Sequence, residues 1–193
     1  MSEVSSTFRL IPGATAPAFS LPDASGRIHT PESLLSGARG LLVVFACNHC
    51  PFVVHLADAL GSFAREIASR GVATVAISSN DAERYPADAP EKMPAFAEAH
   101  GWHFPYLHDA SQKVARAYAA ACTPDFYLFN DARALVYAGQ FDESRPGRGI
   151  PTGQDLAAAV EHLLAGRGTP APWFPSTGCN IKWKPGNEPE WFG

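Results

Sequence analysis

The sequence contains few cysteines, no long apolar run and no excess of basic charge. There are four cysteines among 193 residues, too few for the disulfide framework that holds small secreted domains together. Nowhere do about 18 apolar residues follow one another, so no membrane-spanning helix is expected. Lys and Arg number 15 against 19 Asp and Glu, for a formal net charge of −4, and they offer no basic surface for a phosphate backbone. Nucleic acids and membranes are therefore not expected partners.

The N-terminal segment lacks the apolar core of a secretory signal. Its first residues, MSEVSSTFRL, carry Glu3 and no apolar stretch, so we expect a cytoplasmic protein. In that reducing compartment, two cysteines that are close in sequence are more often catalytic or metal-binding than structural.

Hydrophobic periodicity predicts an α/β domain. The apolar runs at residues 40–46 and 72–79 are typical of strands buried on both faces. Between them, apolar residues recur every three or four positions until Gly71, which predicts an amphipathic helix. Strand, helix and strand then form a parallel unit with a right-handed crossover. Runs at residues 125–130 and 134–139, separated by DAR, predict an antiparallel hairpin.

Further elements are expected on both sides of this unit. We predict an N-terminal hairpin that turns at Ser25, a short extended piece at residues 104–109, and a long polar loop at residues 80–90 to which we assign no role. Helices are predicted at residues 91–100, at 111–121 with Asp109 or Ser111 as cap, and at 152–165 with Thr152 as cap.

The sequence CNHC places Cys47 and Cys50 between the first central strand and the helix that follows it. If the helix begins at the cysteines, its N-terminal N–H groups and its dipole stabilise a thiolate at Cys47. In such pairs the pKa falls from about 8.5 to between roughly 3.5 and 7.5. We therefore expect Cys47 to attack a substrate disulfide and the more buried Cys50 to resolve the mixed disulfide. His49, between them, is a candidate for stabilising the thiolate or relaying a proton.

A zinc site is the alternative use of these residues. Structural zinc needs four ligands, and the candidates in the sequence are Cys47, Cys50, Cys122, Cys179, His49 and His55. The pair adjoins an apolar strand and a long helix instead of a second Cys-x-x-Cys. We therefore expect redox chemistry with no metal and no cofactor, and a non-catalytic metal-binding protein stays as the alternative.

From residue 11 to residue 166, the order of elements, the CNHC sequence and the Thr-Pro dipeptide before the hairpin resemble the thioredoxin-like superfamily. The resemblance implies an α/β fold with a central mixed β-sheet flanked by helices, an N-terminal β-hairpin and an irregular C-terminal extension. It also implies a cis peptide bond before Pro124, contact of Pro124 with the cysteine pair, and a place for Thr123 in the substrate groove. The implied activity is disulfide exchange with a protein or a small thiol.

The N-terminal sequence GATAPAFSLPDASGR and the dipeptide Cys50-Pro51 resemble the peroxiredoxin or redoxin (AhpC/TSA) branch. There the peroxidatic cysteine occupies the position of Cys50, so a thiol peroxidase is the alternative activity. Peroxiredoxins have threonine where Cys47 stands and proline where Val43 stands, and both departures favour a dithiol. Thioredoxin has a buried acid at the position that Leu41 occupies here. Another group must therefore transfer the proton to and from Cys50.

The composition changes after Gly166. Residues 167–193 are rich in Pro and Gly yet hold three of the four tryptophans, which disordered tails seldom carry. We expect a domain at residues 1–166 and an extension at 167–193 that packs on it or on the second subunit of a homodimer. Cys122 and Cys179 are then either inert buried thiols or a second disulfide or electron relay, if the extension brings them together.

Overall fold

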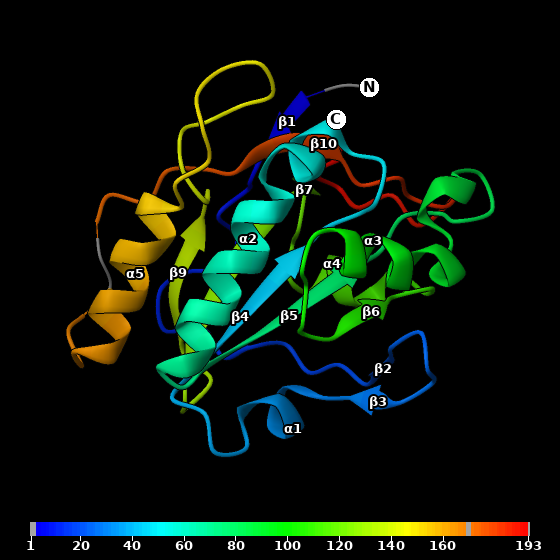
Figure 1. The fold of residues 1–193 in the computed structure, drawn as a ribbon. Helices are drawn as coiled ribbons and strands as arrows, with labels where there is room; N and C mark the ends of the chain where they lie inside the picture. The colour runs from blue at the N-terminus through cyan, green and yellow to red at the C-terminus, as the bar shows by residue number, and fades with distance from the viewer. Residues whose placement is uncertain (1–2, 169–170, 193) are drawn as a thin grey trace.

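The central sheet has five strands in the order β6-β5-β4-β8-β9 (Figure 1). The structure is a computed structural model and describes residues 3–168 and 171–192. The strands are β4 (Gly40–Phe45), β5 (Val72–Ser78), β6 (Tyr106–His108), β8 (Asp125–Asn130) and β9 (Leu135–Gly139). Because β4 runs parallel to β5 and antiparallel to β8, the sheet is mixed, and the expected hairpin of β8 and β9 is confirmed.

Helices cover both faces of this sheet. The helices α2 (Pro51–Ser69) and α5 (Gln154–Leu164) pack on one face (Figure 1). The helices α1 (Pro31–Leu35) and α4 (Lys113–Ala117) pack on the other. Side chains of β4 alternate between the two clusters, with Leu42 and Val44 under α2 and Leu41 and Val43 on the opposite side, as a strand period of two requires. The α/β architecture expected from the sequence is confirmed.

Shorter elements complete the chain. The N-terminal hairpin pairs β2 (Leu21–Pro22) with β3 (Ile28–His29), as expected. Two 3-10 turns, η1 (Pro86–Asp88) and η2 (Pro90–Lys92), lead into α3 (Met93–Ala99). None of the helices in the described ranges is both long and apolar enough to cross a membrane.

A second sheet, which the sequence did not predict, joins both ends of the chain to the segment before Pro124. Its antiparallel strands lie in the order β1-β10-β7. They are β1 (Glu3–Ser5), β10 (Thr177–Asn180) and β7 (Cys122–Thr123). After β10, Ile181 and Trp183 are buried in the cluster under α1 and α4. The aromatic extension therefore packs on its own chain.

The start of α2 differs from the prediction. The helix begins at Pro51, and Cys50 is its N-cap with extended backbone angles of φ −70° and ψ 120°. Proline suits the first helical position and keeps the residue before it out of the helical region. Cys47 therefore lies before the helix, and Cys50 occupies the N-terminal position expected for Cys47.

The cap of α5 also differs. Gly153, not Thr152, is the N-cap, and the Asp142 carboxylate accepts hydrogen bonds from the backbone N–H groups of both residues, at 2.6 and 2.7 Å. Asp142 thus fixes the turn that enters α5, and no side-chain hydrogen bond caps the helix itself. At α4 the N-cap residue is Gln112, neither Asp109 nor Ser111, but the Asp109 carboxylate accepts from the first-turn N–H groups of Val114 and Ala115 at 3.0 Å. Both predicted helices that precede β8 are shorter than expected.

Candidate redox site at the CNHC segment

The segment between β4 and α2 places two thiols against Thr123. Cys47 and Cys50 are buried, with 1% and 0% of their surface exposed. The Cys47 Sγ lies 3.5 Å from Thr123 Oγ1, and the Cys50 thiol donates a hydrogen bond to the Thr123 carbonyl oxygen at 3.1 Å. The peptide bond between Thr123 and Pro124 is cis, as the resemblance implied.

The two thiols have opposite electrostatic preferences. A hydrogen bond from Cys47, with further hydrogen bonds from Thr123 and Cys179, lowers the pKa of Cys50 to about 5. The hydrogen bond to Cys50, burial and the charge of Asp88 raise the pKa of Cys47 well above its ordinary value. Cys50 also caps a 19-residue helix, whose dipole favours a negative charge there. The start of α2 at Pro51 and these opposite directions favour a thiolate at Cys50, whereas the sequence favoured Cys47.

Asp88 holds the CNHC segment from the loop after β5. Its fully buried carboxylate accepts hydrogen bonds from the backbone N–H groups of Asn48 and His49, at 2.8 and 3.2 Å. It also accepts from His49 Nδ1 at 2.6 Å and from Asn80 Nδ2 at 2.8 Å. These bonds fix both the backbone between the cysteines and the orientation of the imidazole. Sequence reasoning missed Asp88, since one acid in a polar loop carries no signal.

The loop that contains Asp88 is less exposed than its composition indicates. Asn80 and Asp81 are buried like Asp88, and the Tyr85 ring stacks on His49 with 5.8 Å between ring centroids and 8° between planes. A second missed interaction joins the loop to the C-terminal extension, because Asn80 Oδ1 accepts from the Lys182 backbone N–H at 2.8 Å. The loop thus packs over the CNHC segment instead of extending into solvent.

The other two cysteines have different surroundings. Cys179 pairs with Thr123 across the β10–β7 ladder, and Asn180 pairs with Cys122. Directly paired residues share a face of the sheet and successive residues alternate, so Cys179 and Cys122 point to opposite faces. The expected approach of Cys179 to Cys122 is therefore corrected, since Cys179 shares its face with the Thr123 side chain and the CNHC thiols.

Cys122 instead lies near a buried acid. Burial, followed by the charge of Asp125, raises the pKa of the Cys122 thiol well above its ordinary value. Burial raises the pKa of Asp125 to about 6, although Ser6 and Tyr127 donate hydrogen bonds to its carboxylate at 2.7 and 2.9 Å.

Comparison with known proteins assigns the family. Residues 12–138 match the AhpC/TSA family. The chain belongs to this family. A Mycobacterium tuberculosis (strain H37Rv) protein named "Putative peroxiredoxin" is 34% identical over 118 residues, which cover 59% of this chain and 67% of the relative.

Solved structures place this AhpC/TSA chain in the thioredoxin-like fold. A hypothetical protein of Sinorhizobium meliloti 1021 is 49% identical with a TM-score of 0.90, covering 94% of this chain and 98% of that one. The thioredoxin domain of a thiol-disulfide oxidoreductase from Bacteroides vulgatus is 18% identical with a TM-score of 0.62, covering 80% and 99%. At that identity only the fold is shared, and it is the fold that the sequence indicated.

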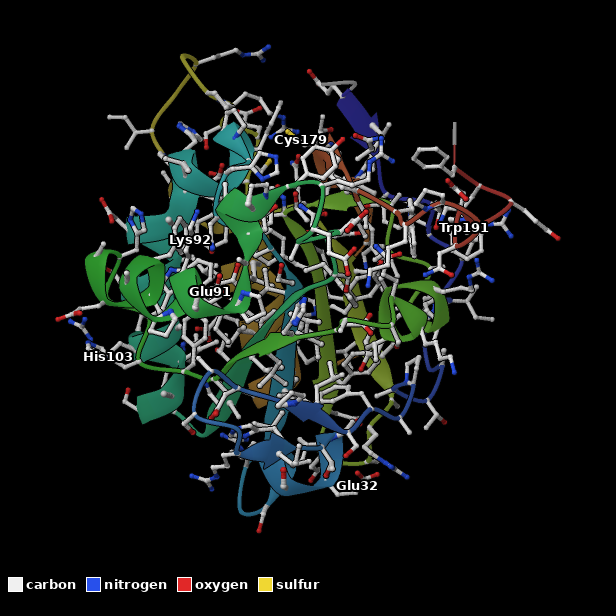
Figure 2. The ribbon with its side chains drawn as sticks, turned by 90° about the vertical axis from the view of Figure 1, so that its right-hand side faces the viewer. Glu32, Glu91, Lys92, His103, Cys179 and Trp191 are labelled. Atoms are coloured by element: carbon white, nitrogen blue, oxygen red, sulfur yellow. The ribbon has the colours of Figure 1, made fainter. Side chains whose placement is uncertain are left out.

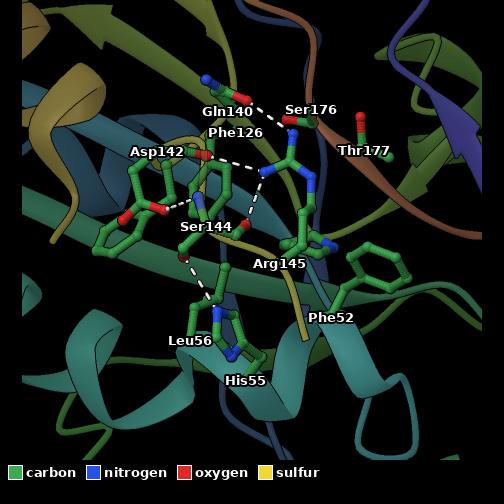
Figure 3. Close-up of a pocket in the computed structure, with 12 residues that line it drawn as sticks. Phe52, His55, Leu56, Phe126, Gln140, Asp142, Ser144, Arg145, Ser176 and Thr177 are labelled. Atoms are coloured by element: carbon green, nitrogen blue, oxygen red, sulfur yellow. Dashed lines mark hydrogen bonds between the residues drawn. The ribbon is translucent and has the colours of Figure 1, made fainter. Parts of the chain in front are cut away.

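A small pocket lies beside Pro124 in this AhpC/TSA protein (Figure 3). Its apolar wall consists of Phe52, Leu56, Pro124, Phe126 and Phe141. Across from this wall, the Arg145 guanidinium donates to Gln140 Oε1 at 2.9 Å and to the carbonyl oxygens of Asp142 and Ser144. Thr123 does not line the pocket; it is 2% exposed and faces the thiols.

One group of residues in the described ranges has ligand atoms close enough to hold a metal ion. Cys47, His49 and Asp88 offer atoms within 4.8 Å of one another. Two of the zinc ligands considered from the sequence lie elsewhere. His55 Nε2 is 3.1 Å from Ser144 Oγ, and Cys122 faces away from Cys47 and Cys50. The four-ligand sets considered there are not assembled at this AhpC/TSA site.

Proposed function

We propose that this protein is a thiol-disulfide oxidoreductase in which Cys50 is the nucleophile and Cys47 the resolving thiol. The observation that carries the proposal is the placement of Cys50 as the N-cap of α2, where the helix dipole favours a thiolate, with Cys47 buried beside it against the same Thr123. The pKa of Cys50 is lowered and that of Cys47 is raised, which agrees with this placement. A thiolate is the attacking species in disulfide exchange. The roles first expected for the two cysteines are therefore exchanged.

The exchange proceeds in two steps. The Cys50 thiolate attacks one sulfur of a substrate disulfide, the substrate S–S bond breaks, and the other substrate sulfur leaves as a thiolate. Cys47 then loses its proton and attacks Cys50 Sγ in the mixed disulfide, which releases the second substrate sulfur and leaves a Cys47–Cys50 disulfide. The proton of Cys47 passes to the departing thiolate, and His49, oriented by Asp88, is the candidate relay.

Substrate contact is proposed at the pocket beside Pro124. Phe52, two residues after Cys50, and Pro124, directly after Thr123, both line it, so an apolar side chain held there lies next to the reactive segment. A protein disulfide or a small disulfide in the cytoplasm is the proposed substrate class. Since both thiols are buried, the substrate must displace part of the protein surface that covers them.

A redox titration tests this proposal. The purified protein is equilibrated in glutathione buffers of graded potential, and its disulfides are mapped by peptide mass spectrometry. We expect a reversible Cys47–Cys50 disulfide, with a potential between roughly −270 and −120 mV as for other proteins with this fold. If these two cysteines never pair while the fold stays intact, the proposal is wrong. Stoichiometric metal in the purified protein would instead support a metal-binding role for Cys47, His49 and Asp88.

A thiol peroxidase is the second candidate, and the lowered pKa of Cys50 in an AhpC/TSA chain favours it. The Cys50 thiolate would attack the peroxide O–O bond, forming a sulfenic acid and releasing water or an alcohol. Cys47 would then condense with the sulfenic acid, form the disulfide and release water. Peroxide consumption that depends on added dithiol and is lost in Cys50→Ser would establish this activity. Consumption equal to that of the buffer would exclude it.

A further inference from the structure

Cys179 lies in the same buried cluster as Cys47 and Cys50. It belongs to β10, which contacts α2 and pairs with the segment before Pro124. In Figure 2, Cys179 lies at the end of the molecule where α2 begins. The chain separates Cys179 from Cys50 by more than a hundred positions, and the second sheet brings them together.

The pairing of β10 with β7 places the Cys179 side chain on the side of Cys47 and Cys50. Cys179 is paired with Thr123, and Thr123 is the residue that both CNHC thiols contact, at 3.5 Å through its hydroxyl and 3.1 Å through its carbonyl oxygen. Since paired residues share a face, the Cys179 side chain is on the side of Thr123 that holds the two thiols. Cys179 contributes, after Cys47, to the lowered pKa of Cys50, and burial followed by Cys50 raises the pKa of Cys179 to about 12.

The approach of β10 to this segment is unusually close. A Cβ atom added at Gly178 would lie 2.1 Å from the Thr123 carbonyl oxygen, nearer than any side chain allows. Glycine therefore lets the strand that carries Cys179 pack directly against the backbone that contacts Cys50.

We propose that Cys179 is a third redox thiol of the site, which forms a disulfide with Cys50 as an alternative to Cys47. This inference rests on the proposed role of Cys50 as the sulfur that reacts with substrate. It assigns to the C-terminal extension a chemical role in addition to packing, and it makes Cys50 the sulfur shared by two possible disulfides.

The exchange conserves both atoms and electrons. In the oxidised protein, the Cys179 sulfur gives up its proton and attacks Cys50 Sγ. The Cys47–Cys50 bond breaks, the Cys50–Cys179 bond forms, and Cys47 leaves as a thiolate that takes up the proton. One disulfide and one thiol are present before and after. In the same way, Cys179 can release a substrate thiol from a mixed disulfide on Cys50 when Cys47 is blocked.

Variants without Cys47 test this proposal. Reduced Cys47→Ser protein is treated with oxidised glutathione, and the fate of Cys50 is followed by intact mass and peptide mapping. We expect glutathione to attach to Cys50 and then to leave as Cys179 forms an intramolecular disulfide with it. In Cys47→Ser/Cys179→Ser the adduct should persist, with a release rate at least about tenfold lower. The matched control is Cys47→Ser/Cys122→Ser, which removes a buried thiol on the opposite face and should behave like Cys47→Ser.

Two results would overturn the inference. One is a stable glutathione adduct on Cys50 of Cys47→Ser with Cys179 still reduced, in protein whose circular dichroism and thermal unfolding match the wild type. The other is equal release with and without Cys179; a Cys179→Ala version of the double variant repeats this comparison if the serine variant folds poorly. Disulfide mapping of the oxidised wild type separates this inference from the proposed function. If the wild type forms a Cys47–Cys50 disulfide and no variant forms a Cys50–Cys179 disulfide, only the role of Cys179 is refuted. If the Cys50–Cys179 disulfide forms and the Cys47–Cys50 disulfide never does, only the Cys47–Cys50 mechanism is refuted.

Discussion

At the scale of single residues, Cys50 is the group whose protonation controls the site. Its pKa is lowered to about 5 chiefly by the hydrogen bond from Cys47. We predict that a thiolate is present at neutral pH in the reduced protein and that Cys47→Ala raises the pKa of Cys50 toward the ordinary value of about 8.5. Ultraviolet absorbance of the thiolate, followed against pH, measures both values without requiring a reagent to reach a buried sulfur.

Two variants control this titration. Cys50→Ser should abolish the ionisation at low pH, and Cys122→Ala should leave it in place, because Cys122 is on the opposite face of β7 from Cys50. If the first thiolate of the wild type forms only near pH 8.5, Cys50 is not the activated sulfur.

The buried Asp125 should make stability depend on pH. Burial raises the pKa of Asp125 from 3.8 to about 6, so the folded chain holds this proton to a higher pH than the unfolded chain. The stability from this group is complete below about pH 4 and is lost as the pH rises through 6. We predict that the unfolding free energy of wild type relative to Asp125→Asn falls by roughly 2 kcal/mol between pH 4 and pH 7. Urea unfolding at both pH values measures this difference, and a difference that is constant with pH would contradict the raised pKa.

Asp88 should matter more for stability than its place in a polar loop indicates. Its carboxylate accepts four hydrogen bonds, from two backbone N–H groups and two side chains. Asp88→Ala leaves these donors without an acceptor, and we predict a loss of about 2–4 kcal/mol in unfolding free energy. Glu83→Ala, an exposed acid in the same loop, is the matched control and should change stability little. A loss no larger than that of Glu83→Ala would show that Asp88 does not hold the CNHC segment.

At the scale of the elements, β10 depends on a single glycine. A side chain at position 178 would meet the Thr123 carbonyl oxygen, so Gly178→Ala must move β10 away from β7. We predict a loss of about 1–3 kcal/mol in stability and slower release of glutathione from Cys50 when Cys47 is absent. Gly168→Ala, with open space around the added carbon, is the control. Equal stability of the two variants would show that the close contact is not needed.

The elements that sequence predicted best are those with strong periodicity. The strands β4, β5 and β8 and the body of α2 lie within a residue or two of their expected bounds, because long apolar runs and helical spacing are local signals. The predicted start of α2 was wrong because Pro51 sets it, and the predicted cap of α5 was wrong because Gly153, in a left-handed conformation, takes that position. The β1-β10-β7 sheet was missed since strands of two to four residues have no periodicity to detect.

At the scale of the whole molecule, the site depends on segments far apart in the sequence. Cys47, Cys50 and Pro124 were identified as candidates from motifs. Asp88 and the place of Cys179 next to Cys50 could not be, because both follow from tertiary packing of a loop and an extension onto the sheet. The same packing brings the acceptor for the CNHC backbone and a third thiol to one cluster. The chemistry proposed here therefore requires the extension to stay in place.

This requirement predicts that the extension unfolds together with the sheet. β10 is hydrogen-bonded on both sides, to β1 and β7, and Lys182 after it is held by Asn80 and Gln112. Detaching the extension would uncover buried Ile181 and Trp183, at a cost of roughly 1.5–3 kcal/mol for each such side chain. We expect the amides of β10 in the native protein to exchange with solvent as slowly as those of β8, whereas those beside Ile150, which is 83% exposed, exchange fast. Hydrogen exchange measured by mass spectrometry on overlapping peptides makes the comparison. Exchange in β10 as fast as beside Ile150 would mean that the extension detaches on its own, and that Cys179 then leaves Cys50 before the domain unfolds.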